Sequence, residues 1–256
     1  MTEQQQQGLC DLIRQLGTKA QALRDAGLQI ESKGRQDFVS EADVYVERVL
    51  KQWLAEQFPE DGFLGEESGL VAGKSGVWVL DPIDGTTNFI RGMDYWCISL
   101  AYVQQDSIEL GIIYAPDRHE FFFARRGAGA FLNGKRLVLQ EPAADAVVVG
   151  MGRSSRTTVA RYTQTLESVL NDGIEYRRFG AGALMLAHVA SGLVHAYYEE
   201  YINSWDVLAG LLLITEAGGS SNAFLENDGL LEGNVVLAGC TGVVSRLSLL
   251  LPSLKQ

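Results

Sequence analysis

The chain has 256 residues, of which 46% are hydrophobic and 21% charged, a composition typical of a globular protein with a substantial core. Its 21 lysine and arginine residues against 32 aspartate and glutamate residues give a formal net charge of -11, which opposes nucleic-acid binding through bulk electrostatics. It has no run of about 18 apolar residues and no signal peptide at its start, so we expect a cytoplasmic protein that does not bind a membrane.

Two helices are predicted near the start of the chain. Apolar residues at helical spacing predict the first over about Gln4 to Ala26, ending near Gly27. The second follows Ser40 and has an apolar face from Ala42 to Trp53. Asp43 lies on or beside that face, where a carboxylate needs a partner, and the spacing of Ser40 and Asp43 fits a capping box.

The pattern then changes to strands. From Trp96 to Val138, short apolar segments separated by turns, one of them at Asn133-Gly134, predict an antiparallel meander. Helices and strands alternate after that. Strands are expected near Ala146 to Gly150, up to Phe179, in VHAYYE and in VVLAG; helices are expected near Thr157 to Leu170, Ala183 to Ala190, Trp205 to Ala217, and up to Leu251. The order predicts sheets covered by helices.

The segment LDPIDGTTNF places two carboxylates, Asp81 and Asp84, three residues apart after an apolar run. A turn would account for the proline and for Asp-Gly. Alternatively, the two carboxylates and the Ile83 carbonyl are oxygen ligands of the kind that hard divalent cations take, and Gly85-Thr86 offers backbone N–H groups to a phosphate. The continuation does not resemble a returning strand, which favours the metal site.

Two further acidic features are weak when taken alone. Glu66 and Glu67 in FLGEESG are typical of a solvated loop. In NSWDVLAG, Ser204 is expected to cap a helix and Asp206 to lie in its first turn, where the helix dipole alone favours an acidic residue. The cysteines lack C-x-x-C spacing and the histidines lack H-E-x-x-H spacing, so neither kind of zinc site is predicted.

Taken in order, GEES, DPIDGTTNF and WDVLAG resemble the inositol monophosphatase family, and the resemblance extends over nearly the whole chain, from DFVSEAD to TEAGG. It implies a magnesium-dependent, lithium-sensitive phosphomonoesterase. The implied fold is an α/β (α+β) protein, a layered αβαβα sandwich of the inositol monophosphatase and fructose-1,6-bisphosphatase type. We expect one domain over residues 1–256, with a metal-binding half over about 1–140 and an α/β half over 141–256, and a homodimer.

Carried over to matching positions, the resemblance implies two to three Mg²⁺ ions. Glu66, Asp81 and the Ile83 carbonyl would hold the first. Asp81, Asp84 and Asp206 would hold the second, and Glu66 would help to hold a third. The four carboxylates and a phosphate monoester bring about six negative charges, which these ions would largely neutralise.

The resemblance also implies catalytic and substrate-binding residues. The Thr86 hydroxyl, paired with Asp43, would orient or deprotonate the attacking water, and Glu66 completes the catalytic set. The implied substrate-binding residues are Asp84, Gly85, Thr86, Gly180, Ala181, Gly182, Glu199 and Asp206.

The substrate is left open by the sequence. Gly180-Ala181-Gly182 replaces a more usual Gly-Ser/Thr-Ala, and the preceding Arg177-Arg178 either offers charge to a second phosphate or carboxylate or is a solvated strand end. Inositol monophosphate or a similar small polyol or sugar phosphate is the expected substrate, with histidinol phosphate, fructose 1,6-bisphosphate and 3'-phosphoadenosine phosphate as alternatives. A noncatalytic interaction protein on this fold is a further alternative. No G-x-G-x-x-G motif supports a dinucleotide-binding enzyme.

Overall fold

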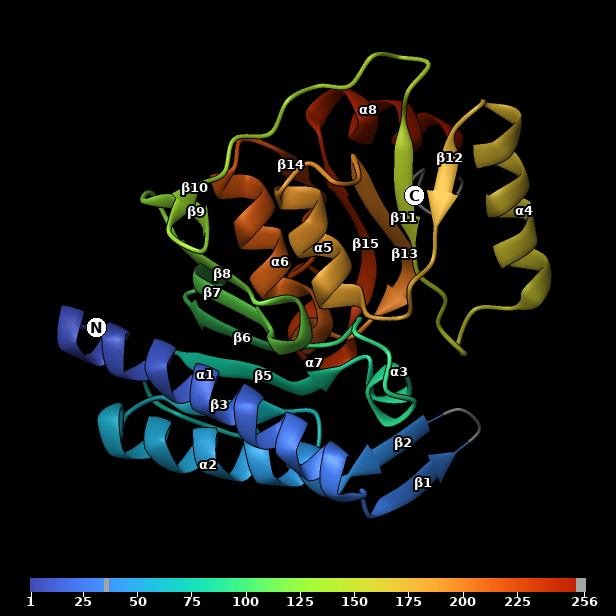
Figure 1. Cartoon of the computed structure of the whole chain (residues 1–256). Helices are drawn as coiled ribbons and strands as arrows, with labels where there is room; N and C mark the ends of the chain where they lie inside the picture. Colours follow the sequence, from blue (N-terminus) through green and yellow to red (C-terminus); the bar gives the residue numbers. More distant parts are fainter. Residues whose placement is uncertain (35–36, 252–256) are drawn as a thin grey trace.

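Helices and sheets alternate in five layers in the computed structural model of the chain, which describes residues 1–34 and 37–251 (Figure 1). The outer helices α1 (Glu3–Ala26) and α2 (Glu41–Gln57) cover one face of an eight-stranded sheet. Between this sheet and a five-stranded sheet lie α5 (Gly182–Ala190) and α6 (Ser204–Glu216). The far face of the five-stranded sheet carries α4 (Val159–Asn171) and α8 (Thr241–Leu250). The predicted αβαβα sandwich is confirmed.

The eight-stranded sheet has the order β10-β9-β8-β7-β6-β5-β3-β4. Its strands are β3 (Gly62–Gly65), β4 (Gly69–Val71), β5 (Val77–Asp84), β6 (Cys97–Gln104), β7 (Ser107–Ala115), β8 (Glu120–Arg125), β9 (Gly129–Leu132) and β10 (Lys135–Arg136). β6 to β10 are neighbours in chain order and antiparallel, which confirms the meander. Its tight turns use positive φ angles, among them +49° at Asn133 and +79° at Gly134.

The five-stranded sheet has the order β12-β11-β13-β15-β14. Its strands are β11 (Val148–Met151), β12 (Glu175–Arg177), β13 (Ala196–Ile202), β14 (Ser220–Ser221) and β15 (Asn234–Gly239). β11 is parallel to both β12 and β13, so the carboxyl ends of these three strands point the same way.

The predicted helices lie where the apolar period placed them. α1 ends at Gly27, whose φ of +96° suits glycine. α2 begins with the capping box formed by Ser40 and Asp43. One prediction was wrong: the N-cap residue of α6 is Asn203 and not Ser204, and the Asn203 side chain makes no cap hydrogen bond. The buried Ser204 hydroxyl instead donates to the Leu230 carbonyl at 2.7 Å.

Several short elements were not predicted because they contain too few residues to show a period. They are the hairpin of β1 (Ile30–Gly34) and β2 (Asp37–Ser40), the 3₁₀ turn η1 (Pro116–Arg118), and the helices α3 (Thr86–Ile90) and α7 (Gly229–Glu232). α3 explains why the residues after DPIDG do not read as a strand. Within residues 1–34 and 37–251, no helix is both long and apolar enough to span a membrane.

Helix α6 is apolar on nearly all sides because it lies between two sheets. Eight consecutive residues from Val207 to Ile214 are buried, as expected for a helix without a solvent-facing side. It packs against β6 and β7 of one sheet and β14 and β15 of the other. Its amino-terminal turn is thereby held at a fixed place beside the end of β5.

Candidate active site

Two parallel strands end beside each other and bring acidic residues together. β3 and β5 pair with Gly65 opposite Leu80, and the Glu66 N–H donates to the Leu80 carbonyl at 3.1 Å. Glu66 therefore follows its strand at the level of Asp81. Pairing of β5 with β6 shifts register between Asp81 and Asp84, an irregularity that re-aims side chains at a strand end.

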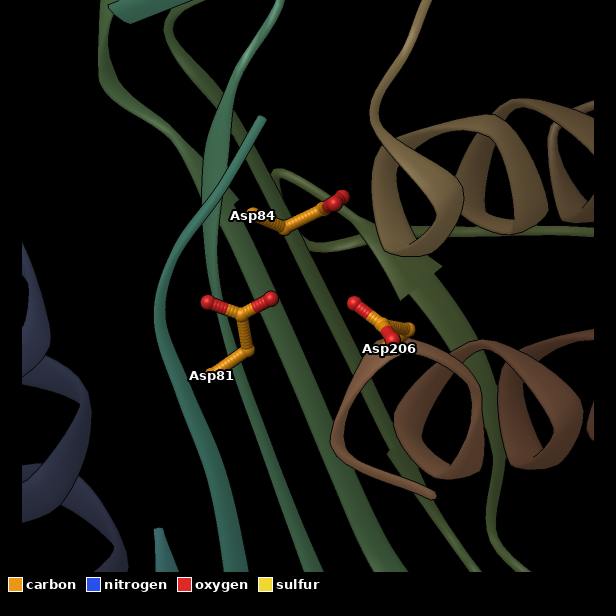
Figure 2. Close-up of side chains that lie close together, drawn as sticks. All are labelled: Asp81, Asp84 and Asp206. Atoms are coloured by element: carbon orange, nitrogen blue, oxygen red, sulfur yellow. The ribbon is translucent and has the colours of Figure 1, made fainter. Parts of the chain in front are cut away.

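A fourth acidic residue, Asp206, comes from α6, and with Asp81 and Asp84 it forms a cluster of three aspartates. Asp206 lies in the first turn of this helix, and Figure 2 shows it facing Asp81 and Asp84 across a small gap. Carboxylate oxygens of these three residues lie within 4.8 Å of one another. The Ser99 hydroxyl on β6 donates to the Trp205 carbonyl at 3.0 Å and so ties the start of α6 to the sheet. The arrangement offers hard oxygen ligands from three directions.

Burial and mutual repulsion act on the protons of this cluster. Burial, with Glu66 and Asp84 nearby, raises the pKa of Asp81 well above its ordinary value. Burial, with Asp84 and Glu66 nearby, raises the pKa of Asp206 in the same direction. A divalent cation would favour the ionised carboxylates and relieve the repulsion. The donor set therefore fits magnesium.

Asp84 has a second partner that the sequence did not reveal. Its carboxylate accepts the backbone N–H of Gly182 at 3.0 Å and that of Leu184 at 3.1 Å, at the start of α5. Burial raises the pKa of Asp84 to about 6, against the opposing effect of these N–H donors. One carboxylate thus faces the acidic cluster and also stabilises a helix amino terminus.

The predicted pair of Thr86 and Asp43 is close in space. The Thr86 hydroxyl lies 3.4 Å from Asp43 Oδ1 and 2.9 Å from the Ile83 carbonyl oxygen. Asp43 Oδ2 accepts the Ser40 N–H at 2.8 Å and its hydroxyl at 2.6 Å. The capping box and the contact with Thr86 therefore coexist, one on each oxygen. Burial raises the pKa of Asp43 to about 6.

The backbone after β5 is held in a shape that only glycine adopts easily. Gly85 has a φ of +86°, and a Cβ there would lie 3.0 Å from both the Ala181 Cβ and the Tyr95 carbonyl. Asn88, which we had not singled out, donates to the Tyr95 and Phe179 carbonyls at 2.8 Å each. These contacts hold the Gly180 segment against the segment that carries Asp81 and Asp84.

A cavity of about 190 Å³ opens beside the cluster. Asp84, Asp206, Glu199 and the backbone of 180–182 contribute to its lining. Burial raises the pKa of Glu199 to about 7, and the Tyr197 hydroxyl donates to Glu199 Oε2 at 2.6 Å. Six of the predicted site residues thus line one cavity: Asp84, Gly180, Ala181, Gly182, Glu199 and Asp206. The other predicted residues, Asp43, Glu66, Asp81, Ile83, Gly85 and Thr86, are not part of its lining.

A buried acid on α2 supports the Glu66 loop and was also missed by the sequence. Glu47 Oε2 accepts the Glu67 N–H at 3.0 Å. A Cβ at Gly65 would lie only 2.4 Å from that oxygen, so glycine is needed where β3 passes Glu47. The signal that could have identified Glu47 is its place on the apolar side of α2, near Asp43.

Comparisons with known proteins place the chain in one family. The family model described as "Inositol monophosphatase family" matches residues 1–248. An inositol-1-monophosphatase of Rhizobium meliloti is 38% identical over 217 residues, 83% of this chain and 82% of that protein. The Nus factor SuhB of Xylella fastidiosa is 38% identical over 195 residues, 75% and 71% of the two chains. The crystal structure of the extragenic suppressor protein suhB from Bartonella henselae superposes with a TM-score of 0.87 at 32% identity, and the match covers 94% of this chain and 96% of that one.

Proposed function

This chain belongs to the inositol monophosphatase family, and on that premise we propose that it is a magnesium-dependent phosphomonoesterase acting on inositol monophosphate or a similar small polyol or sugar phosphate. The observation that supports this most is the meeting of Asp81, Asp84 and Asp206 within 4.8 Å. Such a group of acids, of which Asp81 and Asp84 are buried and Asp206 is half-buried, is costly without a cation, and it lies beside a cavity that would admit a small phosphorylated alcohol.

Two to three Mg²⁺ ions would be held by Glu66, Asp81, the Ile83 carbonyl, Asp84 and Asp206. When bound, they supply a polarised phosphoryl group, a water of lowered pKa and a stabilised leaving oxygen. The Ile83 carbonyl already accepts the Thr86 hydroxyl, and a carbonyl oxygen has a second lone pair for a cation.

The protein's own groups would position the phosphate and the water. Backbone N–H groups of Gly85 and Thr86 would bind phosphate oxygens. The Thr86 hydroxyl would orient the attacking water, and Asp43 Oδ1 would accept its proton through that hydroxyl. The raised pKa of Asp43, about 6, suits a general base near neutral pH. Glu66, beside Asp81, would complete the catalytic set.

Glu199 and the 180–182 backbone would contact the alcohol part of the substrate. Glu199 is buried and lines the cavity, so its carboxylate would accept a hydrogen bond from a substrate hydroxyl. The subunit arrangement is proposed from the resemblance alone as a homodimer, and sedimentation velocity would test it.

Phosphate release from myo-inositol 1-phosphate tests the proposal. The purified protein should release phosphate in the presence of magnesium and release none in EDTA. The variant Asp81→Asn should be inactive in both conditions. Asp106→Asn is the matched control, because Asp106 is in an exposed turn at a φ of +58° that asparagine tolerates. Undiminished turnover in EDTA would contradict the proposal. So would failure to hydrolyse every member of a panel that adds histidinol phosphate, fructose 1,6-bisphosphate and 3'-phosphoadenosine phosphate.

A second candidate function is that of a binding protein, which the relative named Nus factor SuhB favours. A binding surface does not need buried acids gathered around a cavity, nor a threonine hydroxyl placed against Asp43, and this chain has both. The magnesium-dependent assay separates the two candidates.

A further inference from the structure

Two arginines line the cavity beside the acidic cluster without an ion-pair partner among the residues that the structure describes. Arg153 and Arg178 are both exposed and both contribute to the lining. Among residues 1–34 and 37–251, neither guanidinium takes part in an ion pair or a hydrogen bond. Their donors are therefore available to a ligand in the cavity.

The backbone directs both residues to this place. β11 and β12 are parallel, with Gly150 opposite Arg177, so the two arginines follow the carboxyl ends of paired strands. Ligands commonly bind outside such ends. The segment after Arg178 is fixed because the Phe179 carbonyl accepts a hydrogen bond from Asn88.

Arg153 is brought beside Glu199 by the glycine before it. The Gly152 N–H donates to the Tyr198 carbonyl at 2.9 Å. A Cβ at Gly152 would lie 1.8 Å from Glu199 Oε2, so the backbone passes directly over this carboxylate. Glu199 and the two arginines therefore share one end of the substrate cavity.

The charges of the lining do not match a neutral alcohol once the proposed cations are bound. Asp84 and Asp206 also line the cavity, and the proposed cations would neutralise them. Arg178 lies close enough to Glu199 to favour its ionised form electrostatically, so two guanidinium groups then face one remaining carboxylate and leave a positive charge in excess. An uncharged polyol has hydroxyls for Glu199 but no group that requires a guanidinium. Phosphate and carboxylate oxygens match the guanidinium donors geometrically and in charge.

We propose that Arg153 and Arg178 are specificity-determining residues that bind a second anionic group, phosphate or carboxylate, on the alcohol part of the substrate. Glu199 accepts a hydrogen bond from a hydroxyl of the same molecule. This inference rests on the proposed phosphatase function and narrows its substrate class to polyol or sugar phosphates that carry two anionic groups.

Three phosphomonoesters with one six-carbon chain test the proposal: glucitol 6-phosphate, gluconate 6-phosphate and glucitol 1,6-bisphosphate. They differ at the far end, which is neutral, a carboxylate or a phosphate. We expect a higher kcat/KM for at least one of the two doubly anionic compounds. Arg153→Ala and Arg178→Ala should each lower kcat/KM for that compound by about tenfold, mainly through a higher KM. Tenfold is the scale of a lost hydrogen bond to a charged group. For glucitol 6-phosphate, kcat/KM should change by less than about twofold.

Arg177→Ala is the matched control, because Arg177 is the neighbouring exposed arginine and donates to Glu175 and to the Tyr176 carbonyl. This variant should leave kcat/KM unchanged for all three substrates. Equal kcat/KM for the three compounds in the parent, or equal losses on all three in the alanine variants, would overturn the proposal.

A different result would mark failure of the phosphatase function itself. If the parent hydrolyses none of the three with magnesium, calorimetric binding of the same compounds tests the arginines independently. Tighter binding of an anionic compound that is lost in Arg153→Ala and Arg178→Ala supports them. Equal binding of all three compounds overturns the inference.

Discussion

Replacing Asp206 with asparagine should stabilise the metal-free protein and reduce its response to magnesium. Asp206 faces two other carboxylates within 4.8 Å, and burial with Asp84 and Glu66 nearby raises its pKa well above the ordinary value. Asparagine has nearly the same size, and its amide N–H groups can donate to a neighbouring carboxylate. The variant therefore removes one negative charge and one proposed metal ligand with little change in packing.

The size of the effect follows from the geometry. Two unit charges 4.8 Å apart at an effective dielectric constant near 20 repel by about 3 kcal/mol. Protons retained by the metal-free cluster reduce this, so we expect a gain of about 1 kcal/mol at pH 8, or about 2–4 °C in Tm for a chain of this size. Magnesium at 100 times its Kd should stabilise the parent by about 2.7 kcal/mol and the variant by less than half as much.

Melting curves of parent and variant, each in EDTA and in millimolar magnesium, measure both effects. Asp84→Asn is the informative control because it removes the same charge from the same cluster. Its carboxylate also accepts the N–H groups of Gly182 and Leu184, and an amide offers only one acceptor oxygen. One N–H would lose its partner at about 1–3 kcal/mol, so this variant should not melt higher. A full magnesium shift in Asp206→Asn would refute the assignment of Asp206 as a ligand.

Three further predictions use the same site. Asp43→Asn should lower kcat by about 10²-fold with a small change in Tm. Ser40→Ala should instead lower the free energy of unfolding by about 1 kcal/mol and leave kcat unchanged. A normal kcat in Asp43→Asn would exclude the water-orienting role. Burial raises the folded-state pKa of Asp43 to about 6 from 3.8, so the folded state binds the extra proton between these values. In EDTA, urea titrations should therefore show the stability of the parent relative to Asp43→Asn highest below pH 3.8 and falling as pH rises through 6, and a rise over that interval would contradict the pKa. Gly152→Ala should displace the Glu199 side chain, because the new Cβ would lie 1.8 Å from Glu199 Oε2. We expect this displacement to raise KM by about tenfold. An unchanged KM in steady-state kinetics would argue against a role for Glu199 in substrate binding.

The long elements could be predicted because their residues repeat with a clear period. The helix from Gln4, the antiparallel meander and the buried helix that follows Asn203 all show such patterns. The neighbouring positions of Asp81 and Asp84 were equally accessible, because their spacing lies within one short segment. Asp43 was notable from the sequence as an acid on an apolar face, and the structure explains it by contacts on both of its oxygens.

The remaining features depend on contacts between residues far apart in the chain. Asp84 binds the start of α5, 98 residues further on. Asn88 joins two loops through carbonyls, and no local pattern distinguishes it from any other polar residue after a turn. Ser204 looked like a helix cap because serine is common there, but a carbonyl 26 residues away accepts its hydroxyl. The meeting of Asp206 with Asp81 came only from the family resemblance.

The position of α6 between the two sheets has a consequence for a chain that is still being synthesised. Glu66, Asp81 and Asp84 leave the ribosome long before Asp206, which is supplied by a helix that begins at Ser204. That helix packs against β6 and β7 of the earlier sheet, so its docking also delivers the last carboxylate. A nascent chain therefore has an incomplete acidic cluster through most of translation, and the proposed phosphatase activity could begin only once this late helix has emerged and docked.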